Sequence, residues 1–303
     1  MVRTQLFLLG TPVIDYYAKY NKTLKDYKIK VGCTNYFPIK IIEKILKKIK
    51  IISINAGDNA KNVAIAYKLA CAKSCAYTGI LGKDKEAKIF KKSLKKYKIK
   101  DLTIQKDGRT GKIICLIDKN KQRTFIANLG VGIKRLRLKN FIKSKIFFCT
   151  NITFINKEIG LDAKKIIKRL KKEGTKIAIS LESPNLIKKN LSKTLEFCSY
   201  ADYIFLNEQE MRAFGTKQKE LKKLKALIFL KMGKKGSRLI KDGKIILEQK
   251  AKRIKKVKDT TGAGDFFAGG ALAGLAKGYD LKKTLRIANN LAVKVITRVG
   301  VEP

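Results

Sequence analysis

The stretch DTTGAGDFFAGGALAG, residues 259–274, is the most informative part of this 303-residue sequence. Gly262, Ala263 and Gly264 let consecutive backbone N–H groups converge, and the small residues that follow predict a helix whose N-terminus adds about half a positive charge. These groups form an anion hole. Asp265 beside it would repel a bound phosphate, unless its task is to take a proton from an attacking hydroxyl. We interpret the stretch as a phosphoryl-transfer site; an ordinary helix cap is the alternative.

Strands alternate with helices on both sides of this stretch, which predicts an α/β fold with a mostly parallel central sheet covered on both faces. We expect one domain, residues 1–303. The rhythm breaks at about 16–38 and 103–128, where extra strands would form a small lid. The predicted strands are residues 5–10, 74–81, 111–118, 123–128, 145–149, 176–181, 203–206, 226–231 and a hairpin at 237–246, and the predicted helices are residues 39–50, 62–69, 85–96, 159–173, 261–277 and 281–299.

Composition excludes several classes of function. The chain has no His, so His-based triads and His metal ligands are absent. Lys plus Arg is 70 and Asp plus Glu is 24, a net charge of +46, but only 11 of the basic residues are Arg and the Lys is dispersed. We therefore expect no specific nucleic-acid partner. Six isolated Cys, no secretory segment and no apolar run of about 20 residues predict a reduced, cytoplasmic protein without a membrane span.

The stretch at 259–274 resembles the C-terminal signature of the ribokinase-like (phosphofructokinase B) family of carbohydrate and nucleoside kinases. Other segments resemble that family's motifs in the same order along the whole chain, and within the family they are most similar to the adenosine kinases. The resemblance implies a three-layer ribokinase-like fold with a small β lid. The matching segments are GTPVID (10–15), NAGDNAKNVA (55–64), RTFIANLG (123–130), NEQE (207–210) and KMGKKG (231–236).

On the acceptor side, the resemblance implies that Asp15 accepts two sugar hydroxyls. Gly57 and Asn62 would approach the same sugar through backbone and amide groups. Arg123 would lie near the transferring phosphate. The alternatives are a turn for Asp15, a helix cap for Asn62 and a solvated strand charge for Arg123.

On the nucleotide side, the resemblance implies that Asn207 and Glu210 contact the water shell of Mg²⁺, with helix capping as the alternative. Gly233 and Gly236 would let the backbone pass close to ATP, or would form a hairpin turn. Asn290, with Asn289 beside it, would flank the adenine.

Three positions depart from the family pattern. Asp58 replaces the second Gly of the N-terminal motif and adds a carboxylate to the sugar pocket. Lys231 stands where a Thr usually opens the nucleotide loop, and Thr11 stands where adenosine kinases have Asn. These changes leave phosphoryl transfer intact and bear on the choice of acceptor.

The sequence thus predicts an ATP-dependent kinase that phosphorylates a primary hydroxyl of a nucleoside, adenosine first, at the 5′ position. A sugar or sugar phosphate is the alternative acceptor within the family. A non-catalytic relative or a nucleic-acid-binding protein is a weaker alternative. We expect Mg²⁺ with ATP, leave a monovalent cation open, and expect a monomer or homodimer.

Overall fold

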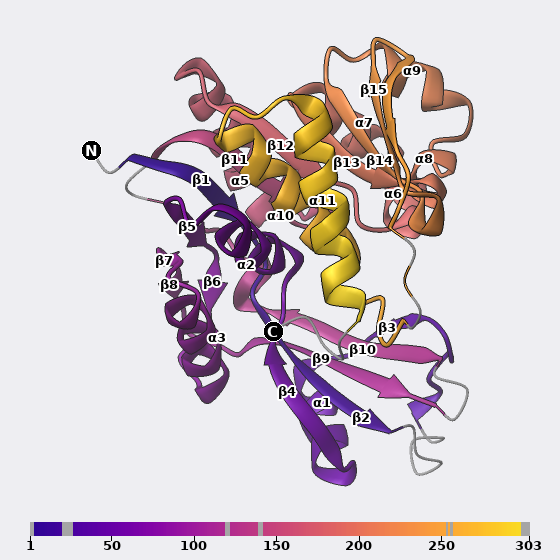
Figure 1. The fold of residues 1–303 in the computed structure, drawn as a ribbon. Helices are drawn as coiled ribbons and strands as arrows, with labels where there is room; N and C mark the ends of the chain where they lie inside the picture. The colour runs from indigo at the N-terminus through magenta and orange to yellow at the C-terminus, as the bar shows by residue number, and fades with distance from the viewer. Residues whose placement is uncertain are drawn as a thin grey trace.

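The computed structural model describes residues 3–19, 27–118, 122–138, 142–252, 254 and 257–297. Nine strands form the main sheet, and only the pairs β14–β15 and β15–β16 are antiparallel. A mostly parallel sheet was expected, and it is confirmed (Figure 1). In spatial order the strands are β16 (Lys244–Gln249), β15 (Ser237–Lys241), β14 (Leu227–Lys231), β13 (Tyr203–Asn207), β12 (Lys176–Ser180), β11 (Lys143–Thr150), β1 (Arg3–Leu9), β5 (Cys75–Thr78) and β7 (Lys100–Asp101).

Helices cover both faces of this sheet, and each face has its own apolar core. Alternate residues of β1 point into different cores, because successive strand side chains face opposite sides: Leu6 and Leu8 join one core, and Phe7 and Leu9 the other. One face carries α2 (Asn59–Cys71), α3 (Lys85–Lys96), α10 (Ala263–Ala276) and α11 (Leu281–Ile296), and the other carries α4 (Asn151–Ile155), α5 (Ile159–Lys172), α6 (Pro184–Lys189), α7 (Leu191–Ser199), α8 (Glu208–Arg212) and α9 (Gln218–Lys223) (Figure 1).

Small residues let α10 lie tightly between α2 and α11. A Cβ on Gly269 would come within 2.5 Å of Ala66 in α2, and a Cβ on Gly270 would come within 2.9 Å of Ala288 in α11. Contacts that close exclude any larger side chain, so both positions need glycine. The small residues of the stretch at 259–274 are therefore needed for helix packing as well as for the predicted chemistry.

A second sheet lies beside the main one, at the bottom of the view in Figure 1. The helix α1 (Ile39–Lys48) covers one of its faces with Ile42 and Ile45. The predicted lid segments, about 16–38 and 103–128, both contribute strands to this sheet. Its spatial order is β3 (Thr34–Tyr36), β10 (Arg123–Gly130), β9 (Thr110–Ile117), β2 (Val13–Lys19) and β4 (Ile51–Ala56).

The sequence interpretation missed some of this sheet and misplaced one border. The strand β4 was not predicted, although it pairs with β2 along most of its length. Residues 103–109 lie outside the second sheet, because β8 (Ile104–Gln105) pairs with β6 (Ile80–Leu81) instead. The parts of the lid prediction at 20–26 and 119–121 lie outside the described residues. The short helices α6 to α9 were also not predicted.

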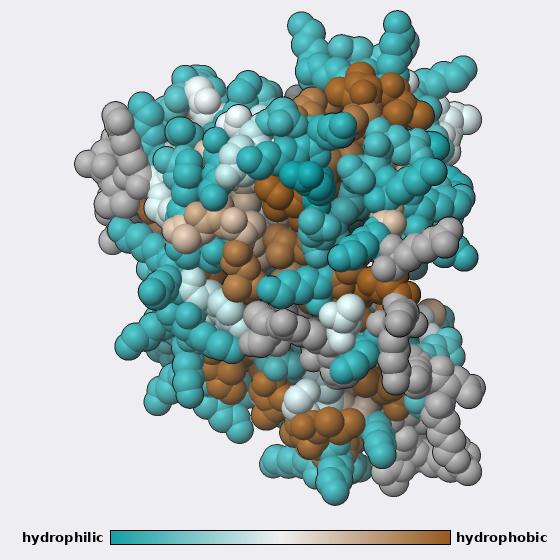
Figure 2. Space-filling model, viewed as in Figure 1, coloured by the Kyte–Doolittle hydropathy of each residue, from teal (hydrophilic) through white to brown (hydrophobic). Residues whose placement is uncertain are grey.

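The visible surface is mainly hydrophilic, as the many dispersed Lys residues require (Figure 2). Exposed apolar side chains occur on the second sheet, where Ile52 is 58% and Tyr36 is 61% exposed. None of the described helices has the length and hydropathy needed to cross a membrane. The six Cys are free thiols: Cys33 is exposed, Cys71 is half-buried and the other four are buried.

Candidate active site

The predicted site residues come from chain segments that meet at the carboxyl edge of the main sheet. Asn207 ends β13, Lys231 ends β14, and α10 begins nearby at Ala263. Parallel α/β sheets bind ligands at this edge, where loops and helix N-termini gather. Asp15 lies just after β1, on β2 of the second sheet, so the site lies where the two sheets adjoin.

The N-terminus of α10 presents unused backbone donors. Gly262 caps the helix with φ +75°, in the left-handed region that favours glycine. Ala263 donates its N–H to the Thr260 carbonyl, whereas the N–H groups of Gly262, Gly264 and Asp265 have no acceptor among the described residues. These three N–H groups are free to bind an anion. The contributions of Gly262 and Gly264 to an anion hole stay a prediction, and Asp265 offers a further donor that the sequence interpretation did not name.

The Asp265 carboxylate is held beside these donors by α2. Asn62 donates from Nδ2 to Asp265 Oδ2 over 3.0 Å. Burial raises the pKa of Asp265 to about 7, and the charges of Asp58 and Glu210 raise it further. The hydrogen bond from Asn62 and the Lys231 ammonium lower this pKa. Asn62 Oδ1 is buried and has no partner in the described part of the chain. It remains available to a donor such as a substrate hydroxyl.

Asp15 forms a second acidic centre. A Cβ on Gly57 would lie 2.6 Å from Asp15 Oδ2, so only glycine lets the backbone pass this carboxylate. Burial raises the pKa of Asp15 to about 7. The Lys61 ammonium lowers this pKa, and the charge of Asp58 raises it. Lys61 itself is fully buried and donates to the Ala56 carbonyl. Sequence interpretation missed Lys61, because a single Lys in a Lys-rich chain gives no signal.

Asp58 is engaged by the protein itself. Its Oδ2 accepts a 2.5 Å hydrogen bond from the Tyr77 hydroxyl and a 3.3 Å hydrogen bond from the Lys61 N–H, and the N–H groups of Thr11 and Ala60 also donate to the carboxylate. It caps α2 with φ +99°. A carboxylate has about four acceptor positions, and four donors of the chain fill them. This geometry favours a structural role for Asp58, and its contact with a substrate stays a prediction.

Glu182 is a further acid that the sequence interpretation missed. It follows β12 at the same sheet edge with φ +65°, and it accepts hydrogen bonds from the Ile152 N–H and the Asn59 side chain. Burial raises its pKa to about 8, and the charges of Asp58 and Asp265 raise it further. The signal was its place after a buried strand, the same argument that identified Asp15.

Arg123 reaches across from the second sheet to the start of the signature stretch. Its guanidinium bonds the Asp259 carboxylate and the Thr261 hydroxyl. Asp259 is only 6% exposed, so this is a well-shielded ion pair. The structure thus puts Arg123 near the anion hole but pairs its charge within the protein.

One face of the second sheet carries half-buried apolar and aromatic side chains beside Asp15. The register pairs Asp15 with Ile113 and Tyr17 with Cys115 across β2 and β9, and Phe125 with Cys115 across β9 and β10, so these residues share a face. The charges of Asp15, Asp259 and Arg123 all act on the pKa of Tyr17, so this face adjoins the start of the signature stretch.

Asn207 and Glu210 form a reciprocal helix cap at the start of α8. Asn207 donates its backbone N–H to Glu210 Oε2 over 2.9 Å and its side-chain amide to Oε1 over 2.7 Å. Glu210 is 2% exposed, and both its oxygens are occupied. The pair does not fit Mg²⁺ as direct ligands, and no group of three or more Cys, Asp or Glu side chains within the described ranges is placed to hold a metal. Contact through water stays a prediction.

The loop at 231–236, predicted to bind the nucleotide, is short and turns through two glycines with positive φ. Gly233 has φ +58° and open space around it, whereas Gly236 has φ +103° and packs against the backbone of Gln249. Asn289 is buried and donates to the Ser237 hydroxyl over 2.8 Å, which ties α11 to β15. Asn290 is exposed, and the described contacts do not bring it to the other site residues.

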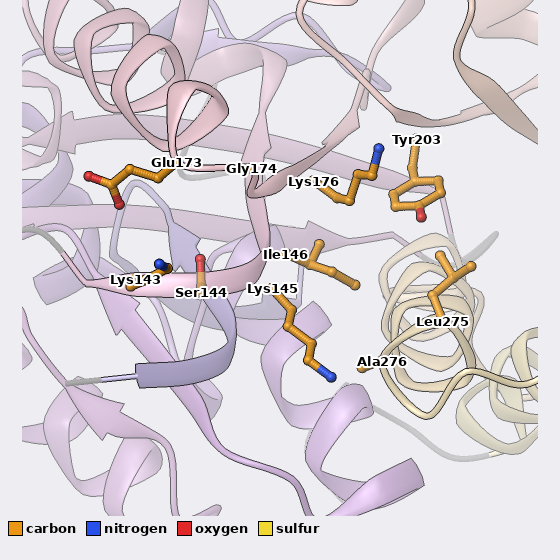
Figure 3. Close-up of a pocket in the computed structure, with 10 residues that line it drawn as sticks. All are labelled: Lys143, Ser144, Lys145, Ile146, Glu173, Gly174, Lys176, Tyr203, Leu275 and Ala276. Atoms are coloured by element: carbon orange, nitrogen blue, oxygen red, sulfur yellow. The ribbon is translucent and has the colours of Figure 1, made fainter. Parts of the chain in front are cut away.

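A cavity of about 390 Å³ lies at the opposite end of the main sheet (Figure 3). It is lined by the first residues of β11 and β12 and by Leu275 and Ala276 at the end of α10. None of the predicted site residues lines it. At 1.5 Å per residue, α10 separates it from the anion hole by about 20 Å.

Comparisons with known proteins identify the family of this chain. The pfkB family of carbohydrate kinases matches residues 26–303. An uncharacterized sugar kinase of Archaeoglobus fulgidus is 24% identical over 74% of this chain and 92% of its own. The adenosine kinase of Schizosaccharomyces pombe is 24% identical over 97% of this chain and 95% of its own.

Solved structures agree on the fold. The adenosine kinase of Sinorhizobium meliloti superposes with a TM-score of 0.86 at 20% identity, covering 99% of this chain and 96% of that one. A probable sugar kinase of Rhizobium etli superposes with a TM-score of 0.88 at 19% identity, covering 100% and 96%. With a family match over nine-tenths of its length, the chain belongs to the pfkB family of carbohydrate kinases, phosphotransferases that act on a hydroxyl group.

Proposed function

We propose that this protein transfers the γ-phosphate of ATP to the 5′-hydroxyl of a nucleoside, adenosine first. The observation that carries the proposal is the arrangement at α10: Asn62 holds the Asp265 carboxylate beside the free N–H groups of Gly264 and Asp265. A base and an anion hole side by side are what an attacking hydroxyl and a transferring phosphoryl group need.

Each residue then has a defined task. The Asp265 carboxylate takes the proton of the acceptor hydroxyl, and its pKa of about 7 is suited to a base that works near neutral pH. Asp15 accepts hydrogen bonds from the other hydroxyls of the sugar and fixes its orientation. The N–H groups of Gly264 and Asp265 stabilise charge on the transferring group. Mg²⁺ bound to the phosphates would supply charge neutralisation.

The apolar face of the second sheet supports a nucleoside rather than a free sugar. Tyr17, Ile113 and Phe125 are half-buried on the same face as Asp15. A free sugar presents hydroxyls and gains little from such side chains, whereas a purine base is a flat ring that packs against them.

A sugar acceptor is the second candidate. Two half-buried acids on the acceptor side, Asp15 and Glu182, could accept hydroxyls of a polyhydroxy compound that has no nucleobase. The same acids oppose a sugar phosphate, because a second anion near them is unfavourable.

The test is a panel assay of ADP release with ATP and one acceptor at a time. We expect kcat/KM to be highest for adenosine, lower for ribose and fructose, and lowest for fructose 6-phosphate. If ribose or fructose is the best acceptor, the sugar-kinase alternative replaces the nucleoside proposal. If the sugar phosphate is best, the argument from the acidic pocket is wrong.

A further inference from the structure

The side chain of Lys231 reaches the anion hole from the neighbouring strand. Lys231 is the last residue of β14, and it is paired in register with Asn207 of β13. A Cβ added to Gly264 would lie 3.0 Å from Lys231 Nζ. The ammonium therefore lies against the first turn of α10, next to the residue whose N–H is free to bind an anion.

This ammonium has no bonded partner in the described part of the chain. No hydrogen bond or ion pair holds it, although Lys231 is half-buried. Its electrostatic effect falls on Asp265, on which Asp58 and Glu210 also act. A half-buried cation that the protein leaves unpaired is a costly feature unless a ligand completes it.

The other cations near the site are already occupied. Arg123 is paired with Asp259 and bonds Thr261, and Lys61 donates to the Ala56 carbonyl. Each of these charges is neutralised or committed within the fold. Among the residues that the structure describes, Lys231 is the cation that remains available where the N–H groups of α10 converge.

Because the proposed phosphoryl transfer needs charge stabilisation at this point, we propose that Lys231 is a catalytic residue whose ammonium binds a non-bridging oxygen of the transferring γ-phosphoryl group. This inference rests on the proposed function. The acceptor oxygen gives its proton to Asp265 and forms a bond to the γ-phosphorus. The bond between that phosphorus and the β,γ-bridging oxygen breaks, and its electron pair leaves on ADP. Lys231 donates hydrogen bonds throughout and transfers no proton.

The test compares Lys231→Met and Lys231→Arg with the control Lys244→Met. Lys244 is an exposed residue at the start of the edge strand β16, outside the predicted nucleotide loop. Removing one preorganised donor costs about 10²–10³ in kcat, so Lys231→Met should lose at least about a hundredfold in kcat with little change in acceptor KM. Lys231→Arg should recover part of the loss, and Lys244→Met should behave as the wild type.

Two further measurements separate catalysis from structure and from the proposed function. Lys231→Met should bind a non-hydrolysable ATP analogue about tenfold or more weakly, because the variant loses its hydrogen bond to the γ-phosphate. It should bind ADP normally, because ADP has no γ-phosphate. The acid limb of its pH–rate profile should move to higher pH, since the cation no longer opposes the raised pKa of Asp265.

Retention of kcat within about threefold in Lys231→Met, or an equal loss of ADP and analogue binding, would overturn the inference. The nucleotide measurements need no acceptor. If the wild type phosphorylates nothing in the panel, the proposed function fails, and the analogue-to-ADP comparison still decides the role of Lys231.

Discussion

Replacement of Asp265 by its amide, Asp265→Asn, removes the base and keeps the shape of the site. The amide oxygen can still accept from Asn62 Nδ2, so the side chain should stay in place. Loss of a general base costs about 10²–10⁴ in rate, which is about 2.7–5.4 kcal/mol of transition-state stabilisation. We expect kcat to fall by that factor while the affinity for ATP changes little.

The same change should stabilise the fold, and the structure fixes the sign. Burial raises the pKa of Asp265 from 3.8 to about 7, so the protonated carboxyl favours folding below pH 3.8 and that stability is lost as pH rises through 7. Above pH 7 the ionised carboxylate costs the fold at most about 4 kcal/mol. The amide carries no charge, so Asp265→Asn should melt at a higher temperature than the wild type at pH 8, with little difference at pH 4.

The assay is coupled ADP release for kcat and a melting curve for stability, each at several pH values. Asp280→Asn is the matched control, because Asp280 also lies at the start of a helix, caps it through the Lys283 N–H, and stands outside the site. Retention of more than about a tenth of the wild-type kcat in Asp265→Asn would refute the assignment of the base. A fall in both kcat and melting temperature would mean that Asp265 is structural.

Three further predictions concern the acceptor and the surface. Asp15→Ala should raise the acceptor KM by about tenfold or more and leave the ATP KM nearly unchanged, since a hydrogen bond to a charged group contributes about 1.5–3 kcal/mol; equal rises in both KM values would make Asp15 structural. Asp58→Gly should keep the ranking of acceptors in the panel assay, because four donors of the chain already occupy the carboxylate; a new ranking would show that Asp58 reaches the acceptor. Because of its net charge of +46, the protein should bind DNA without sequence preference, and this binding should weaken as the salt concentration rises in a filter-binding titration. A sequence-selective complex at physiological salt would contradict this.

The sequence correctly predicted those helices and strands that are determined by residues within the same segment. The helix α3 begins and ends where its periodicity and the Asp84 cap indicate. The strand β4 was not predicted for two reasons. Its residues Ile52 and Ile54 are apolar but exposed, so the segment shows no clear alternation of apolar inward and polar outward side chains, and its partner β2 is distant in sequence. Short helices such as α8 form around caps and tertiary contacts, which leave little periodicity to detect.

The candidate site also contains residues that local sequence indicates and contacts that only the packing of distant segments creates. Asp265 and Asp15 could be predicted because each stands at the end of a recognisable strand or at a helix start. The contacts that refine their roles are long-range: Arg123 and Asp259 are 136 residues apart, and Asn62 and Asp265 are 203 apart. Nothing in the local sequence indicates that Tyr77 bonds Asp58 or that Lys231 lies against Gly264, because the packing of α2, α10 and β14 creates both contacts.

The most direct test of the central claim is formation of a 5′-monophosphate from adenosine and ATP, with 5′-deoxyadenosine as the matched acceptor that lacks only the reacting hydroxyl. Product analysis by mass spectrometry together with ADP release would follow both halves of the transfer. Our account predicts one AMP formed from adenosine per ATP consumed, and ADP release with 5′-deoxyadenosine no faster than with no acceptor. Equal ADP release with the two compounds, or no phosphorylated adenosine, would contradict it.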